Sequence, residues 1–228
     1  MIVHYILLFF IYSFVGWVVE TTANCIQSRR WVDRGFLLGP IIPVYGVGSV
    51  LLTLFLRQHI ADPLVVIVMA IAICGVLEYV TSWVMERLFS ARWWDYSHYK
   101  WNLNGRVCLG NLVLFALGGY MVIAIINPVL FGVFASAPEN VLVVIAAALS
   151  ALFVVDMAVS FSIVWEIKKE TGKFALADNT DEITRRVRQK LMKKSSMYRR
   201  LVKAFPGLKV QPRKRGRKSK KKPGKLFG

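Results

Sequence analysis

Three carboxylates interrupt long apolar stretches of this sequence: Glu20, Glu78 and Asp156. An ionised carboxylate in an apolar environment is costly, so it normally faces protein or water and finds a partner. At about 1.5 Å of helix per residue, all three lie at a similar depth in their stretches. Two interpretations stay open, namely pairing between helices or a polar site for a ligand.

Two arginines are candidate partners for these carboxylates. Arg34 begins the second apolar stretch, and Arg106 begins the fourth. A guanidinium group in either position could pair with a carboxylate or bind a phosphate. No residue is predicted to act in catalysis.

The third apolar stretch carries a polar stripe. Glu78, Ser82 and Glu86 are spaced four residues apart, so they share one face of a helix, and Tyr79 flanks that face. A polar stripe on a helix within an apolar stretch must face protein or water. We therefore expect Glu78, Tyr79 and Ser82 to contribute to any binding site.

The connection before the fourth stretch is rich in aromatic residues, which is typical of a belt at a membrane interface. These residues are Trp93, Trp94, Tyr96, Tyr99 and Trp101. A belt does not explain the polar residues Asp95, Asn104 and Arg106 of the same connection. The alternative is a cap over the bundle, with a binding site near Glu20 and Glu78.

Several enzyme signatures are missing from the sequence. It contains neither the G-x-x-x-x-G-K-[ST] loop of nucleotide hydrolases nor the G-x-S-x-G motif of serine hydrolases. His4, His59 and His98 are too scattered to form a metal site. No metal or cofactor is expected, and an enzyme is less favoured than a non-enzymatic protein.

The elements that must position these residues are apolar and long. Of the 228 residues, 56% are hydrophobic, and they gather in continuous runs of roughly 20 residues or more, the length that spans a bilayer. The predicted spans are residues 3–25, 35–56, 63–88, 107–131 and 140–165. The fold class is therefore an all-α membrane protein with a bundle of about five transmembrane helices.

The charge is distributed very unevenly along the chain. After Trp165 lie 22 of the 30 Lys and Arg and five of the 13 Asp and Glu, so this part carries a net charge of +17. Basic residues also gather in alternating connections, which predicts an N-terminus outside and a C-terminus in the cytoplasm. All three carboxylates then lie in the cytoplasmic half of the membrane.

Three domains follow from these patterns. Residues 1–165 form the transmembrane domain, residues 166–205 a basic amphipathic segment, and residues 206–228 a disordered basic tail. The tail is either a solvated orienting signal or a surface that attracts anionic membrane lipids. Nucleic acid is not expected as a partner, because no motif that reads a groove is present.

The second predicted span is rich in glycine and proline. Pro40 and Pro43 each remove a backbone donor, and this predicts a kink or an unwound stretch. One interpretation is close helix packing through Gly35 and Gly39 with a kink. The other is a broken helix that lines a pathway.

Five strings occur in order and carry a family resemblance: GWVVE at 16–20, RGFLLGPIIPVYG at 34–46, LEYVTSWVMERLF at 77–89, RWWDYS at 92–97 and NLNGRVCLG at 102–110. They resemble bacterial ABC-transporter permeases of the CmpB-like type over about residues 5–125. The resemblance implies a multi-pass protein of the bacterial plasma membrane. A chain of five spans without a coupling domain would need a partner permease and a separate ATPase.

Three functions remain open at this stage. The first is a permease with a polar site open to the cytoplasm. The second is a membrane enzyme acting on a lipid or isoprenoid head group, with Glu78 or Asp95 as base and Arg34 and Arg106 holding phosphate. The third is a non-catalytic assembly or regulatory subunit.

Overall fold

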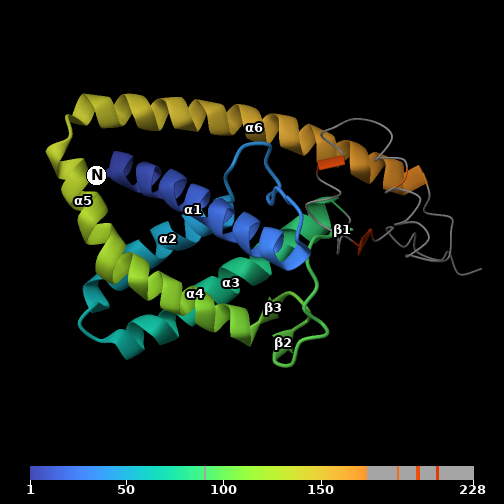
Figure 1. Ribbon diagram of the computed structural model, residues 1–228, viewed down its shortest axis with the longest axis horizontal. Coiled ribbons are helices and arrows are strands. Elements are labelled where there is room, and N and C mark those ends of the chain that lie inside the picture. Colours follow the sequence, from blue (N-terminus) through green and yellow to red (C-terminus); the bar gives the residue numbers. More distant parts are fainter. Residues whose placement is uncertain (90, 174–188, 190–198, 201–208, 211–228) are drawn as a thin grey trace, which may run out of the picture.

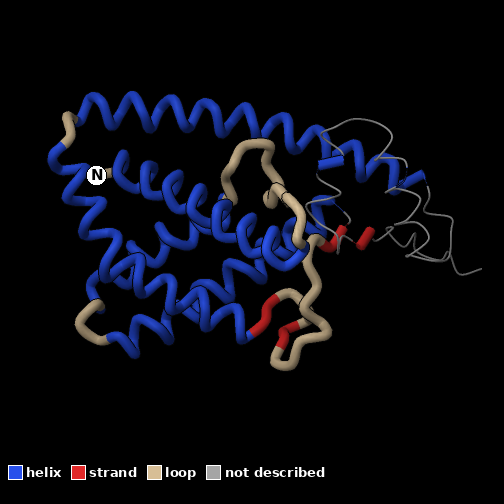
Figure 2. The backbone as a smooth tube through the Cα atoms, in the orientation of Figure 1, coloured by secondary structure: helices blue, strands red, loops and turns tan. Residues whose placement is uncertain are grey.

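The computed structural model describes residues 1–89, 91–173, 189, 199–200 and 209–210, and it is mainly helical (Figure 1). Its helices are α1 (Ile2–Ser28), α2 (Pro43–Leu56), η1 (Arg57–His59), α3 (Pro63–Phe89), α4 (Leu109–Met121), η2 (Val122–Ile126), α5 (Asn127–Ser136) and α6 (Glu139–Lys173). Its strands are β1 (Ala91–Arg92), β2 (Asn102–Leu103), β3 (Val107–Cys108) and β4 (Lys209–Val210). The connections 29–42 and 90–108 lie toward one end of the bundle, together with the end of α6 (Figures 1 and 2). We call this the loop end.

Four helices in the described part of the chain are long and apolar enough to cross a membrane. They are Ile2–Ser28, Pro63–Leu88, Leu109–Ser136 and Glu139–Ile163. The prediction of an all-α membrane protein is confirmed in that the described part of the chain is mainly helical and has four candidate spanning helices. The fourth span runs beyond its predicted end at Phe131, because α4, the π-helical turn η2 and α5 follow one another without a break.

The second predicted span, 35–56, differs from the structure. Only Pro43–Leu56 is helical, and 14 residues reach about 21 Å, less than the thickness of a bilayer core. The helix begins at Pro43 because proline suits the first helical position, where no backbone donor is needed. Pro40 has no backbone N–H to donate, so the preceding residues do not join the helix. The chain thus has an unwound stretch here rather than a kinked full-length helix.

Residues 29–42 return from the end of α1 toward the start of α2 (Figure 2). Helix α1 ends where Arg29 adopts a left-handed conformation with φ 50°. The returning backbone is fixed at its far end, where the Ile42 N–H donates to the Ser13 carbonyl at 2.9 Å. Leu37 is fully buried. We call 29–42 the returning segment.

Helices α1 and α2 approach each other through two glycines. A Cβ on Gly46 would lie 2.2 Å from Ser13 Oγ, and one on Gly16 would lie 2.3 Å from Tyr45 Cγ. Any larger residue at either position would push the helices apart. The interpretation of Gly35 and Gly39 as helix-packing residues is wrong, because both lie in the returning segment.

A buried polar network ties α1, α2 and α5 together. Tyr12 Oη donates to Asn127 Oδ1 at 2.6 Å, and Asn127 Nδ2 donates to Thr53 Oγ1 at 2.8 Å. The Thr53 hydroxyl donates in turn to the Ser49 carbonyl at 2.6 Å. Since every member has a partner, this network stabilises the bundle without leaving an unmet group.

Helix α6 crosses one side of the bundle beside α1 (Figure 1). The predicted amphipathic segment 166–205 and the tail 206–228 lie mostly outside the described residues. Two contacts of this part are described. Strand β4 pairs antiparallel with β1, and Arg200 forms an ion pair with Asp33, which also accepts a hydrogen bond from Trp17 Nε1 at 2.9 Å.

Candidate functional site

Glu20 and Tyr45 meet near the loop end, where α1 packs against α2. Tyr45 Oη donates to Glu20 Oε1 at 2.7 Å. The other carboxylate oxygen, Oε2, lies 3.4 Å from Asn24 Nδ2 and 3.8 Å from Arg34 Nε. About a third of the Glu20 side chain is exposed (34%).

Glu78 of α3 lies close to this pair and is 91% buried. Its carboxylate interacts electrostatically with Glu20 and lies near the Tyr96 hydroxyl. Its Oε2 atom has no hydrogen-bond partner among the described residues. An unmet acceptor in a buried position is costly, so it requires an explanation.

Tyr96 comes from the connection 90–108 and lies near Asn111 of α4. Burial, followed by the negative charges of Glu78 and Glu20, raises the pKa of Tyr96. The phenol therefore keeps its proton, so its hydroxyl is a hydrogen-bond donor beside the Glu78 carboxylate. Glu20, Tyr45, Glu78 and Tyr96 form what we call the glutamate–tyrosine cluster, to which α1, α2, α3 and the connection 90–108 contribute.

A second group of charged residues lies further along α3. Arg106 Nη2 lies 2.9 Å from Glu86 Oε2, and Arg92 Nε lies 3.3 Å from the same oxygen. Arg92 Nη1 also lies 3.4 Å from Asp95 Oδ1. Arg106 Nη1 donates to Ser82 Oγ at 3.2 Å. Glu86, Arg92, Asp95 and Arg106, with Ser82, form what we call the arginine network.

The loop that carries Arg106 is shaped by local hydrogen bonds. Asn104 and Gly105 both have positive φ angles, 55° and 66°. A Cβ on Gly105 would lie 2.7 Å from Asp95 Oδ1, so only glycine fits. Asn104 Nδ2 donates to Tyr79 Oη at 3.2 Å, and Arg106 stacks over the Tyr79 ring at 5.6 Å. Tyr79 thus supports the arginine network.

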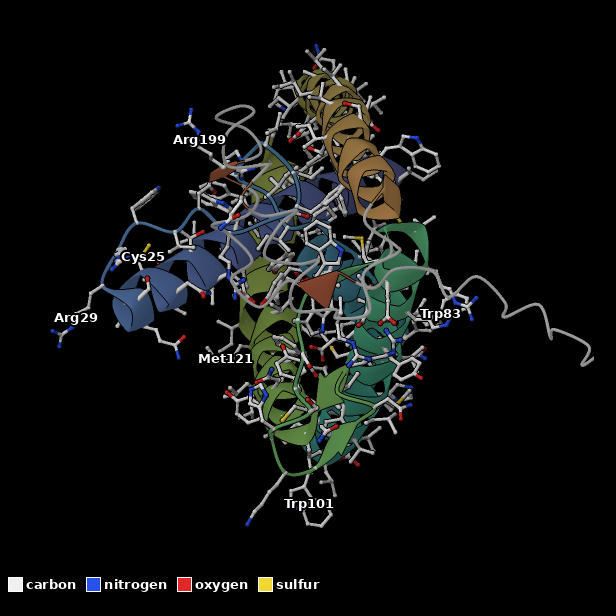
Figure 3. All side chains as sticks on the ribbon, turned by 90° about the vertical axis from the view of Figure 1, so that its right-hand side faces the viewer. Cys25, Arg29, Trp83, Trp101, Met121 and Arg199 are labelled. Carbon is white, nitrogen blue, oxygen red and sulfur yellow. The ribbon has the colours of Figure 1, made fainter. Side chains whose placement is uncertain are left out.

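The aromatic residues of this connection divide into two groups. Trp93 is 4% exposed and packs edge-on against Phe36 at 5.8 Å, and the Trp94 Nε1 donates to the Arg106 carbonyl at 3.0 Å. Trp101, by contrast, is 81% exposed and points away from the bundle, as Figure 3 shows. Trp93 and Trp94 therefore pack inward, whereas Trp101 has the position expected of a belt residue.

Asp156 of α6 holds the returning segment. Its Oδ1 accepts the Leu38 N–H at 2.8 Å and its Oδ2 accepts the Gly39 N–H at 2.7 Å. Ser160 Oγ donates to Oδ1 at 3.0 Å. Two backbone donors that the unwound stretch leaves outside a helix are met by this carboxylate. Its contacts are those of a structural residue.

The predicted site residues therefore separate into three groups. Glu20, Glu78 and Tyr96 come together. The arginine network includes Ser82, Asp95 and Arg106, with Tyr79, Trp94 and Asn104 in contact with Arg106 or its loop. Arg34 lies at the edge of the first group through Glu20, and its backbone N–H donates to Thr21 Oγ1 at 3.3 Å. Trp93 and Asp156 pack against the returning segment.

Tyr45 and Asn111 are missing from the site predicted from the sequence. Tyr45 lies in the glycine-rich and proline-rich string RGFLLGPIIPVYG, and it is the one residue there with a side-chain hydroxyl. That hydroxyl is the signal that could have identified it. Asn111 is an isolated amide near the start of an apolar helix, which is a weaker signal of the same kind.

Comparison with known proteins gives one match. The sequence model of the family described as "Putative ABC-transporter type IV" matches residues 7–161, which include the whole glutamate–tyrosine cluster. No curated protein and no solved structure gives a match. The match covers more than half of the chain and agrees with the four apolar helices. The chain therefore belongs to this ABC-transporter-type family of membrane proteins.

Proposed function

We propose that this chain is the membrane-spanning component of a transporter, and that the transported solute contacts the glutamate–tyrosine cluster. One observation carries the proposal: Glu78 is buried among residues from several elements, and its Oε2 atom still has no donor in the part of the chain that the structure describes. A group that served only to join helices would be expected to have its partners within the protein, as Asn127 does. An unmet acceptor suits a ligand that comes and goes.

The returning segment supports a transport role. Unwound backbone inside a membrane protein is tolerated where it is buried in protein or lines a cavity. In transporters, such broken helices adjoin the binding site. Here the unwound stretch leads directly into α2, which carries Tyr45 of the cluster.

An enzyme acting on a phosphate-bearing head group has less support. Arg106 is paired with Glu86, and Asp95 is paired with Arg92. A base role for Asp95 or a phosphate role for Arg106 would first require these ion pairs to break. The cluster itself contains two carboxylates, which repel phosphate.

The transport proposal requires a separate ATPase and a second permease subunit, either a copy of this chain or a relative. The test is purification of the tagged full-length chain from its native membranes in mild detergent, with ATP hydrolysis as the readout. We expect vanadate-sensitive hydrolysis to co-purify with a nucleotide-binding subunit. A chain that carries no ATPase, and that alone modifies a lipid head group, would contradict the proposal.

Complementation then tests the cluster itself. Glu78→Gln removes one negative charge from the cluster, and Glu139→Gln removes one from an exposed position at the start of α6. In a strain lacking this chain, we expect the Glu139→Gln variant to restore the wild-type phenotype. We expect the Glu78→Gln variant to fail to restore it. Equal restoration by both variants would contradict the proposal that the transported solute contacts the glutamate–tyrosine cluster.

The proposed orientation places the loop end in the cytoplasm, beside anionic lipids and the basic tail. It is tested by labelling single cysteines in a background without Cys25, Cys74 and Cys108. Cysteines at the exposed positions Gln58 and Glu139 should react with an impermeant reagent from outside the cell, and a cysteine at Ser97 should not. The reverse pattern would invert the orientation.

A further inference from the structure

The glutamate–tyrosine cluster has more carboxyl groups than positive charges. Glu20 and Glu78 bring two carboxyl groups, and the nearest positive charge with a described contact is Arg34, 3.8 Å from Glu20. Arg92 and Arg106 lie in the arginine network and are paired with Glu86 and Asp95 there. The two carboxyl groups of the cluster therefore share one described positive charge.

One hydrogen-bond acceptor of the cluster also lacks a described donor. Tyr45 Oη donates to Glu20 and the Tyr96 hydroxyl lies near Glu78, yet Glu78 Oε2 receives no donor from the described residues. A ligand that fits must therefore bring an N–H or O–H donor to this oxygen. A positive charge on the same ligand strengthens that bond.

The aromatic rings around the carboxylates suit a positive charge as well. The Tyr45 ring has Phe115 of α4 edge-on at 5.8 Å, and Tyr96 lies beside Glu78. The faces of such rings attract cations. Carboxylates together with aromatic rings are the chemistry that recognises an ammonium group, whereas a phosphate would be repelled.

We propose that the glutamate–tyrosine cluster binds the ammonium group of a small organic cation, with Glu78 Oε2 accepting one of its N–H donors. The cation approaches past Glu20, whose side chain is 34% exposed. This assignment rests on the proposed function only for the statement that the cation is the transported solute. Binding itself can be measured without transport.

The experiment measures the thermal unfolding midpoint of the full-length protein in detergent while ethylammonium chloride is added at constant ionic strength. A ligand that binds only the folded protein raises the midpoint in a saturable manner. We expect this with ethylammonium, a smaller effect with tetramethylammonium, which has no N–H donor, and none with sodium chloride or sodium phosphate. An equal effect of sodium, a saturable effect of phosphate, or no effect of ethylammonium overturns the proposal.

Variants assign the effect to the cluster. Glu78→Gln should weaken ethylammonium binding at least about tenfold, because a charge-assisted hydrogen bond is lost. The matched charge change Glu139→Gln should leave the affinity unchanged. If Glu78→Gln does not fold, Glu20→Gln takes its place, with the same expected direction. Unchanged affinity in the cluster variant overturns the proposal.

Two substitutions of Tyr96 distinguish the contribution of its ring to binding from that of its hydroxyl. Tyr96→Phe retains the ring, so ethylammonium binding should stay within about threefold, whereas Tyr96→Leu should weaken it further. If Phe and Leu weaken binding equally, the ring has no part in it. Saturable binding of ethylammonium without co-purifying ATPase would leave the cation site standing and remove the transport proposal.

Discussion

The glutamate–tyrosine cluster and the arginine network share helix α3 but are built in opposite ways. In the arginine network each carboxylate has a guanidinium partner, and Arg106 also reaches Ser82. In the cluster, two carboxylates have one arginine near them, and Glu78 Oε2 has no partner among the described residues. The first arrangement stabilises the loop end, and the second leaves an acceptor unmet.

This difference predicts that the arginine network contributes mainly to stability and the glutamate–tyrosine cluster mainly to function. Breaking a paired charge leaves its partner buried and uncompensated, which is strongly destabilising. Neutralising a carboxylate that already lacks a partner removes a cost instead. Substitutions in the two groups should therefore have different effects on unfolding.

The largest expected effect is that of Arg106→Ala. It leaves Glu86 with Arg92 alone and removes the contacts to Ser82 and the Tyr79 ring. We expect the free energy of unfolding to fall by about 3 kcal/mol, measured by denaturant titration in detergent. Arg87→Ala on α3 is the control, because its exposed contact over Trp83 is worth less than about 1 kcal/mol. Equal losses would show that the network has no special role.

Asp156→Asn comes next. The amide retains one acceptor oxygen and carries no charge, so either the Leu38 or the Gly39 N–H loses its acceptor and the other bond loses its charge assistance. We expect a loss of about 2 kcal/mol. Faster hydrogen exchange of these two amides, with no change in those of α3, would locate the effect. If exchange in the returning segment does not change, Asp156 does not hold it.

Tyr45→Phe should have a smaller effect. The variant removes the hydroxyl that donates to Glu20, but Glu20 is partly exposed and water can replace the donor. We expect a loss of about 1 kcal/mol from the same denaturant titration. A loss as large as that of Arg106→Ala would mean that the cluster is a structural network.

Glu78→Gln should have the smallest effect on stability. The amide fits the same space and removes an uncompensated negative charge beside Glu20. We expect the free energy of unfolding to stay within about 0.5 kcal/mol of the wild type or to rise, while complementation is lost. A Glu78→Gln variant that complements fully and has a lower free energy of unfolding than the wild type would contradict the assignment of Glu78 to a ligand site.

Much of the fold follows from the sequence because continuous apolar runs determine the spanning helices. The start of α2 was not predicted, since the hydropathy of 35–42 is that of a helix and only the backbone chemistry of Pro40 and Pro43 prevents one. That stretch also depends on Asp156, more than 100 residues away in the sequence. No local pattern contains such a contact.

The candidate site was predicted in part for the same reason. Depth within the apolar runs selected Glu20 and Glu78, and the structure brings their carboxylates together. The i+4 spacing also placed Ser82 and Glu86 on one face, where both contact Arg106. Which carboxylate pairs with a given arginine depends on the rotation of the helix about its axis and on the path of the connection 90–108. The pairing of Arg106 could therefore not be derived from spacing.

The most direct test compares the thermal unfolding midpoints of Glu78→Gln and Glu86→Gln, purified identically. Both variants make the same chemical change on α3, two helical turns apart, and differ only in the partners of the carboxylate. Glu86→Gln should unfold at a clearly lower temperature than the wild type, and Glu78→Gln at the wild-type temperature or above it. Equal destabilisation by the two variants would contradict the division between a structural network and a ligand site.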